Sequence, residues 1–164
     1  MKSFNDDTIV GTSSKNAYLY PDKPYLMSRY DKQGRRTGAV HSYTWKEANE
    51  IIWDLSCALY TLGFREFDRS AIFAPNRPRW VFAVMASLFL RGAIVPIYPT
   101  SKPEDVWWIL HDSGARVCFC GSKEHLDRVL EVKDRLKSLE KIIVMDPLDH
   151  RPDDMVMGFD ELLE

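Results

Sequence analysis

The sequence predicts an α/β fold, a doubly wound and mostly parallel sheet with flanking helices and an N-terminal β-hairpin. From residue 44 onward, helical patterns alternate with apolar runs of four to six residues, which is typical of strands buried in a parallel sheet. Residues that start and end helices separate these runs. Before residue 44, the polar turn Gln33–Arg36 lies between two strand-like runs, Tyr25–Tyr30 and Ala39–Tyr43, and this arrangement predicts the hairpin.

The first part of the chain is polar and weakly patterned. We expect residues 1–20 to form an irregular arm and residues 21–164 to form the α/β unit. The segment Gly11–Lys15 (GTSSK) has the residue types that can surround a phosphate group. A phosphate loop, however, follows a buried strand and opens onto a helix. Neither is predicted here, so a polar arm is the preferred interpretation.

A helix is predicted directly after the hairpin. Thr44 and Glu47 form a capping-box signature. Apolar residues then recur at steps of three and four, which keeps one face of the helix apolar: Trp45, Ala48, Ile52, Leu55, Leu59 and Leu62. Gly63 ends this helix, because glycine readily adopts the left-handed conformation common at helix C-termini.

The rest of the chain repeats strand and helix. The predicted strands are Arg69–Ala74, Ala93–Ile97, Arg116–Cys120 and Lys141–Met145. The predicted helices run from Pro78 to about Leu90 and from Pro103 to about His111. A third helix starts at Ser122 and has one apolar side, made by Leu126, Val129, Val132, Leu136 and Leu139. One more helix is expected to start within residues 158–164. Asn76 is expected to cap the first of them, and Ser101 with Glu104 to form a capping box at the second.

Composition excludes several classes of protein. The 22 basic and 24 acidic residues give a net charge of −2, so nothing indicates a nucleic-acid partner. Three cysteines are too few for a disulfide framework and favour a reducing compartment. The most apolar run, Trp80–Leu90, is shorter than the ~20 residues that a transmembrane helix needs. We therefore expect a cytoplasmic protein without a transmembrane segment, with peripheral membrane association left open.

Two loops hold the candidate ligand-binding residues. Asn76 and Arg77, with Arg79 close behind, follow one predicted strand, and Tyr98 and Thr100 follow the next. Open α/β sheets bind ligands at the carboxyl ends of their strands, and a helix N-terminus favours anions. The alternatives are a solvated position in the first helical turn for Arg79 and a rigid proline-containing connection for the second loop.

No catalytic or metal-binding pattern is apparent in the residues themselves. Cys118 and Cys120 fall on the same side of a predicted strand, but further ligands would be needed for zinc, and the four histidines are scattered. Buried structural cysteines are the preferred interpretation. For Trp107 and Trp108, packing is preferred over base stacking or acyl binding. We expect no catalytic residue and no metal site in this chain.

An ordered series of motifs does resemble a known family. An aromatic-Thr-x-x-Glu helix start is followed by a Leu-Gly pair, an Asp before a strand that ends in Pro-Asn, a Trp-containing apolar helix, and a Gly-Ala pair before a proline-rich loop. These motifs are Tyr43-Thr44 with Glu47, Leu62-Gly63, Asp68 with Pro75-Asn76, Trp80, and Gly92-Ala93 with Pro96 and Pro99-Thr100. The series resembles the opening of adenylate-forming enzymes, which include AMP-dependent acyl-CoA synthetases, luciferases and peptide-synthetase adenylation domains. The Tyr-Pro-Thr sequence at 98–100 is most similar to the long-chain fatty-acyl branch.

The resemblance implies a two-step ligase. A fatty-acid carboxylate attacks the α-phosphate of ATP to give an acyl-adenylate and pyrophosphate, and the thiol of CoA then displaces AMP. In the family, the phosphate loop, the Mg²⁺ site and the catalytic Lys lie downstream, with no matching positions here. The chain is therefore expected to be an inactive N-terminal fragment that binds no cofactor alone, with the remainder of its parent chain as partner and an exposed apolar face that permits self-association. The alternative is a standalone α/β module that binds a nucleotide or protein without catalysis.

Overall fold

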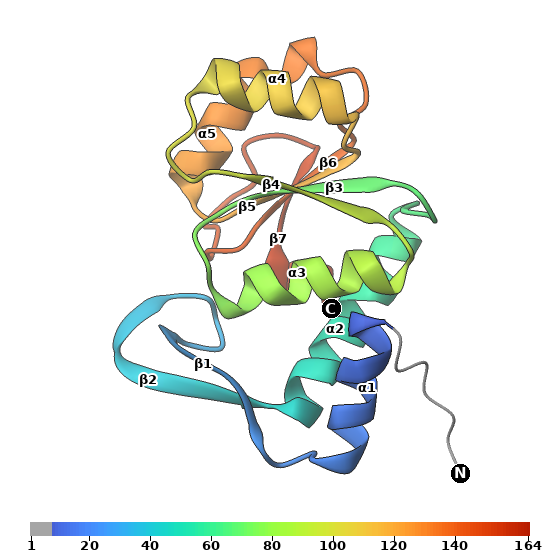
Figure 1. Cartoon of the computed structure of the whole chain (residues 1–164). Coiled ribbons are helices and arrows are strands. Elements are labelled where there is room, and N and C mark those ends of the chain that lie inside the picture. Colours follow the sequence, from blue (N-terminus) through green and yellow to red (C-terminus); the bar gives the residue numbers. More distant parts are fainter. Residues whose placement is uncertain (1–7) are drawn as a thin grey trace.

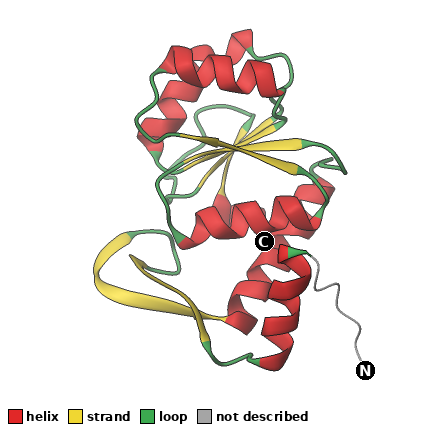
Figure 2. Cartoon of the chain, viewed as in Figure 1, coloured by secondary structure: helices red, strands yellow, loops and turns green. Residues whose placement is uncertain are grey.

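The computed structural model of the chain describes residues 8–164, which form one five-stranded sheet, one hairpin and flanking helices (Figures 1 and 2). In chain order the elements are α1 (Ile9–Leu19), β1 (Pro24–Tyr30), β2 (Arg36–Thr44), α2 (Trp45–Thr61), β3 (Arg69–Phe73), α3 (Pro78–Phe89), β4 (Ala93–Ile97), α4 (Pro103–Ser113), β5 (Val117–Cys120), α5 (Lys123–Val132), the 3₁₀ turn η1 (Lys133–Arg135), β6 (Lys141–Val144), β7 (Val156–Gly158) and α6 (Phe159–Leu162). The antiparallel hairpin β1–β2 lies apart from the sheet.

The sheet has the order β4-β3-β5-β6-β7, and all its neighbouring strands are parallel. From β3 the chain first moves outward to β4, then crosses back over β3 to β5. Helix α3 covers one face of the sheet, while α4 and α5 cover the other (Figure 1). The predicted doubly wound α/β architecture is confirmed. The direction of winding reverses between β3 and β5, and this reversal defines the switch point at which such sheets bind ligands.

Strand alternation builds two hydrophobic cores. Ile72 and Phe119 point to the face covered by α2 and α3. Phe73, Cys118 and Val144 point to the face covered by α4 and α5. Because successive side chains of a strand face opposite ways, a sheet buried on both faces needs apolar residues at nearly every position. That requirement explains the continuous apolar runs in the sequence.

Helix α2 follows the sequence prediction closely. The Thr44 N–H donates to the Glu47 carboxylate over 2.9 Å, and the Glu47 N–H donates to the Thr44 hydroxyl over 3.2 Å, so the capping box is confirmed. The predicted apolar face is buried at Ala48, Ile52, Leu55 and Leu59. Gly63 follows the helix with φ of +95°, the left-handed conformation expected there.

The expected irregular arm is wrong for residues 9–19. These residues form α1, which starts where the Thr8 hydroxyl accepts a hydrogen bond from the Gly11 N–H over 3.0 Å. The GTSSK segment therefore lies inside a helix rather than in a loop. Helix α1 packs against α2 and buries only one residue, Ser13, which explains why its apolar pattern is weak. Residues 1–7 of the expected arm lie outside the described residues.

Two predicted helix caps are also wrong, for one common reason. Proline is favoured at the first position of a helix, where its missing N–H costs nothing. Pro78 and Pro103 take that position, so the capping positions are Arg77 rather than Asn76 and Lys102 rather than Ser101. At the second helix the carboxylate of Asp105, not Glu104, accepts a hydrogen bond from the Lys102 N–H over 3.1 Å.

Strand β7 was not expected from the sequence, since it has only three residues and occupies one edge of the sheet. The final helix, expected within residues 158–164, is confirmed as α6. Among residues 8–164, no helix combines the length and the apolar character needed to cross a bilayer.

Candidate functional site

The carboxyl ends of the parallel strands form the edge at which the candidate residues lie. Asn76 and Arg77 follow β3, and Tyr98 and Thr100 follow β4. The segments after β6 and β7 reach the same edge, because all five strands run in the same direction. The candidate site is therefore built by loops, held in place by the sheet.

A cavity of about 270 Å³ lies beside the ends of β3 and β4. It is lined by Ala74, Asn76, Trp80, Pro96, Ile97, Tyr98 and Pro99. Two of the four candidates, Asn76 and Tyr98, thus come together, whereas Arg77 and Thr100 do not line this cavity. Tyr98 is 82% exposed, so its ring lies open to solvent. The residues that line this cavity offer apolar surface, the Asn76 amide and the Tyr98 hydroxyl, and none of them is a cation that could bind a phosphate.

Arg77 is buried rather than available to a ligand, with only 7% of its surface exposed. Its Nη1 donates to the Gly121 carbonyl over 3.0 Å and to the Asp146 carboxylate over 2.5 Å. The guanidinium also lies 4.3 Å from the centre of the Tyr30 ring. The candidate cation is therefore neutralised inside the fold.

Arg79 is buried in the same way, with 3% of its surface exposed. Its Nη1 donates to the Met145 carbonyl over 2.6 Å. Its Nη2 donates to the Lys32 carbonyl over 2.9 Å and to the Asp160 carboxylate over 2.5 Å. The alternative of a solvated residue in the first helical turn is therefore wrong for Arg79.

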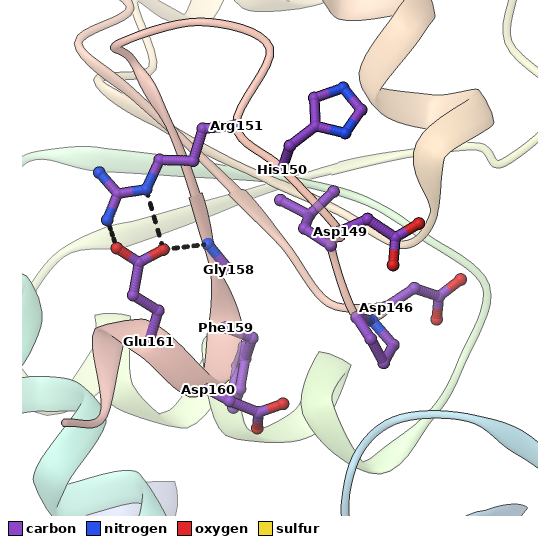
Figure 3. Close-up of a pocket in the computed structure, with 10 residues that line it drawn as sticks. Asp146, Asp149, His150, Arg151, Gly158, Phe159, Asp160 and Glu161 are labelled. Carbon is purple, nitrogen blue, oxygen red and sulfur yellow. Dashed lines mark hydrogen bonds and ion pairs between the residues drawn. The ribbon is translucent and has the colours of Figure 1, made fainter.

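A second cavity, of about 330 Å³, lies beyond these arginines at the ends of β6 and β7 (Figure 3). Residues 146–151 and 158–161 line it. Arg151 and Glu161 form an ion pair across it, and Glu161 also accepts a hydrogen bond from the Gly158 N–H over 3.2 Å. Asp146 and Asp149 lie on the opposite side of the view in Figure 3.

The charges around this edge compensate one another. Three arginines, at positions 77, 79 and 151, each pair with a carboxylate of the same chain, at positions 146, 160 and 161 respectively. Arg77 and Arg79 are buried, so a phosphate group would have to displace Asp146 or Asp160 to reach them, and a buried charge left unpaired is costly. Arg151 is 53% exposed, and its partner Glu161 is 35% exposed. The two buried arginines are therefore not placed to hold the triphosphate of ATP.

The switch point between β3 and β5 is filled by close packing. A Cβ atom placed on Gly121 would lie 2.9 Å from the Cβ of Ala74, so the two loops touch. The Ser122 hydroxyl lies 2.7 Å from Nδ1 of His125, and the His125 ring packs edge-on against Phe73 at 4.6 Å. Burial, together with the charge of Arg128, lowers the pKa of His125. The lowered pKa favours the neutral imidazole in this contact between Ser122 and His125 at the start of α5.

The other candidates have packing roles. Cys118 and Cys120 are buried with their Sγ atoms 4.0 Å apart, and burial raises the pKa of the Cys120 thiol. The Trp107 ring is stacked on His111 at 5.2 Å and faces the guanidinium of Arg135 at 4.2 Å. The expected packing holds for Cys118, Cys120 and Trp107, whereas Trp108 is 59% exposed and does not lie in the core. Within residues 8–164, no cluster of three or more His, Cys, Asp or Glu residues is arranged to hold a metal ion.

Comparison with known proteins gives a consistent result. A family model described as "AMP-binding enzyme" matches residues 14–160. The long-chain-fatty-acid–CoA ligase FadD15 of Mycobacterium bovis is 34% identical over 106 residues, which are 65% of this chain and 18% of that protein. The long-chain-fatty-acid–CoA ligase heimdall of Drosophila melanogaster is 25% identical over 150 residues, which are 88% of this chain and 22% of that protein.

Solved structures show the same fold. A long-chain-fatty-acid–CoA ligase from Archaeoglobus fulgidus superposes with a TM-score of 0.79 at 17% identity, over 99% of this chain and 30% of that one. A ligase from Rhodopseudomonas palustris, described as a putative long-chain-fatty-acid–CoA ligase, gives 0.78 at 19% identity, over 94% and 36%. The chain thus spans about a fifth of the length of these curated relatives and about a third of these structures.

Proposed function

The chain belongs to the family of AMP-binding enzymes as an N-terminal portion of an adenylate-forming acyl-CoA synthetase, and from this premise we propose that it is the scaffold layer of a long-chain fatty-acid–CoA ligase. The whole enzyme would join a fatty acid to CoA through an acyl-adenylate. It would use ATP, Mg²⁺ and CoA, each bound by segments outside these residues. The remainder of the parent chain is then the principal partner of this layer.

One observation supports a scaffold role above all: the arginines at the carboxyl edge are neutralised within the chain. Arg77 and Arg79 are buried and paired with Asp146 and Asp160. Stabilising the charge that develops on phosphate requires preorganised cations or metal ions that face the reacting group. These two arginines face the protein instead.

The purified chain is expected to give no fatty-acid-dependent exchange between ATP and pyrophosphate. The reason is that the two buried arginines at the carboxyl edge are paired with Asp146 and Asp160, and that the family's phosphate loop and catalytic Lys have no matching positions in this chain. Exchange is measured with radiolabelled pyrophosphate and a long-chain fatty acid, with the intact mycobacterial ligase as the active control. Clear turnover by the chain alone would disprove the scaffold role.

A chimera tests the parent activity separately. Residues 14–160 would replace the matching segment of the mycobacterial ligase, and a second version of that ligase would lack the segment. We expect exchange activity in the chimera and none in the deletion. A chimera that folds and binds ATP but activates no fatty acid would argue against a ligase scaffold.

We also propose that the isolated chain self-associates through exposed aromatic side chains on one part of its surface. Trp53 and Tyr60 of α2 are each more than half exposed, and Trp53 contacts Phe89 of α3 at 5.2 Å. Sedimentation velocity at rising concentration is expected to show dimers or larger species, which Trp53→Ser reduces. A monomer at every concentration would refute this proposal.

A cytoplasmic location, with or without peripheral attachment to a membrane, also stays a proposal.

A further inference from the structure

The β1–β2 hairpin is attached to the rest of the chain in two different ways at its two ends. At its base, Tyr43 is buried edge-on against Phe82 at 5.1 Å, and Tyr25 is stacked on Trp45 at 3.9 Å. These are aromatic contacts of the ordinary apolar kind. Between base and tip, most residues of both strands are exposed or half-buried. The hairpin therefore adds little apolar surface to the core beyond its base.

The tip, residues 28–38, lies instead against the two buried arginines. Figure 1 shows the loop of the hairpin beside the start of α3, where both arginines are located. Arg79 donates to the Lys32 carbonyl over 2.9 Å, and the Arg77 guanidinium lies 4.3 Å from the centre of the Tyr30 ring. The contacts of the tip with the sheet layer are thus polar and cationic.

Gly34 shows how close this contact is. Its φ is +81°, and a Cβ atom there would lie 2.6 Å from the Met145 carbonyl oxygen and 2.9 Å from the guanidinium carbon of Arg79. Only a glycine satisfies both the left-handed backbone and the lack of space. The turn itself is rigid, because the Asp31 carboxylate accepts hydrogen bonds from the backbone N–H and from Nε of Arg35, each over 2.8 Å.

Each arginine also donates hydrogen bonds to groups in the segments that follow the strands of the sheet. Arg77 binds Gly121 after β5 and Asp146 after β6. Arg79 binds Met145 after β6 and Asp160 of α6. Among the described residues, the ion pair between the tip and the body joins Lys32 to Glu47. Both of those side chains are substantially exposed, and exposed pairs contribute little.

We propose that Arg77 and Arg79 form a latch that fastens the hairpin tip over the carboxyl edge of the sheet, so that the tip opens as a unit when the latch is broken. The base stays attached through its aromatic contacts while the tip moves. Opening uncovers the two guanidinium groups, which the closed tip keeps from solvent. The latch rests on this geometry alone and stands whether or not the chain is part of a ligase.

Hydrogen exchange followed by mass spectrometry of the full chain tests the latch. Arg79→Met keeps the apolar stem and removes every hydrogen bond of the guanidinium. Backbone amides of the tip, such as Asp31 and Gly34, which bond to carbonyls within the turn, are expected to exchange about tenfold faster or more. Amides of β3 and β5 are expected to keep their wild-type rates.

The matched control is Arg128→Met. Arg128 also donates to two backbone carbonyls, of Pro99 and Ser101, over 3.1 and 3.0 Å, but it lies on α5 away from the hairpin. This variant is expected to increase exchange near residues 98–101 and to leave the tip unchanged. An equal effect of both variants on the tip would overturn the latch.

A second variant covers the case in which Arg79→Met loosens the sheet as well. Tyr30→Leu removes the ring over Arg77 from the hairpin itself and leaves both arginines in place. Faster exchange confined to the tip, with new trypsin cleavage after Lys32, Arg35 or Arg36, supports the latch. Unchanged tip protection in this variant, or acceleration spread evenly over tip and sheet, overturns it.

Discussion

Phe119→Ala is expected to lower the free energy of unfolding by about 3–5 kcal/mol. Phe119 is 0% exposed and lies on β5, in register with Ile72 of β3 and Ile143 of β6. These three residues belong to the core between the sheet and α2 and α3. Alanine removes the ring and leaves a cavity that the strands on both sides hold open. Urea unfolding followed by circular dichroism measures the loss.

Phe67→Ala is the matched control. Phe67 is 75% exposed, so removal of its ring costs no burial. Its φ of +68° is unfavourable for phenylalanine and alanine alike, so the backbone strain is retained. The free energy of unfolding is expected to change by no more than about 0.5 kcal/mol. Comparable losses for the two phenylalanines would mean that Phe119 does not lie in the core.

Most of the fold could be predicted because its signals are local. The apolar steps of α2 and the strand-length runs each need only a few neighbouring residues. Helix α1 was missed because it carries no such local signal. It buries a single serine, so it has no apolar pattern in the sequence, and its packing on α2 stabilises it. The two cap errors show a competition between local signals, since Pro78 and Pro103 at the first helical position set the start more strongly than a nearby polar side chain.

The candidate site could be predicted in position but not in chemistry. Arg77 does follow a strand at the expected edge of the sheet. Whether its charge is available depends on Asp146, which lies 69 residues away in the sequence. Arg79 and Asp160 are 81 residues apart. No periodicity or spacing links positions so distant, and both pairs form only when the segments after β6 and β7 reach the edge.

Gly121→Val is expected to destabilise the chain by about 1–3 kcal/mol, because the switch point has no room for a side chain. The first added carbon would lie 2.9 Å from the Cβ of Ala74 and 3.1 Å from its Cα. The Gly121 N–H donates to the Phe73 carbonyl over 2.9 Å, and the Gly121 carbonyl accepts from Arg77. The loop cannot move away without loss of these two bonds.

Gly38→Val is the control, since Gly38 lies in β2 with no atom within 4 Å of its added Cβ. The free energy of unfolding from urea titrations is expected to fall for Gly121→Val and to stay nearly unchanged for Gly38→Val. Equal stability of both variants would show that the switch point has space after all. A ligand could then enter between β3 and β5, and close packing would no longer argue against a ligand site at the switch point. Loss of stability for Gly121→Val alone would instead support close packing of the loops after β3 and β5 at the switch point, the place where such sheets usually bind a ligand.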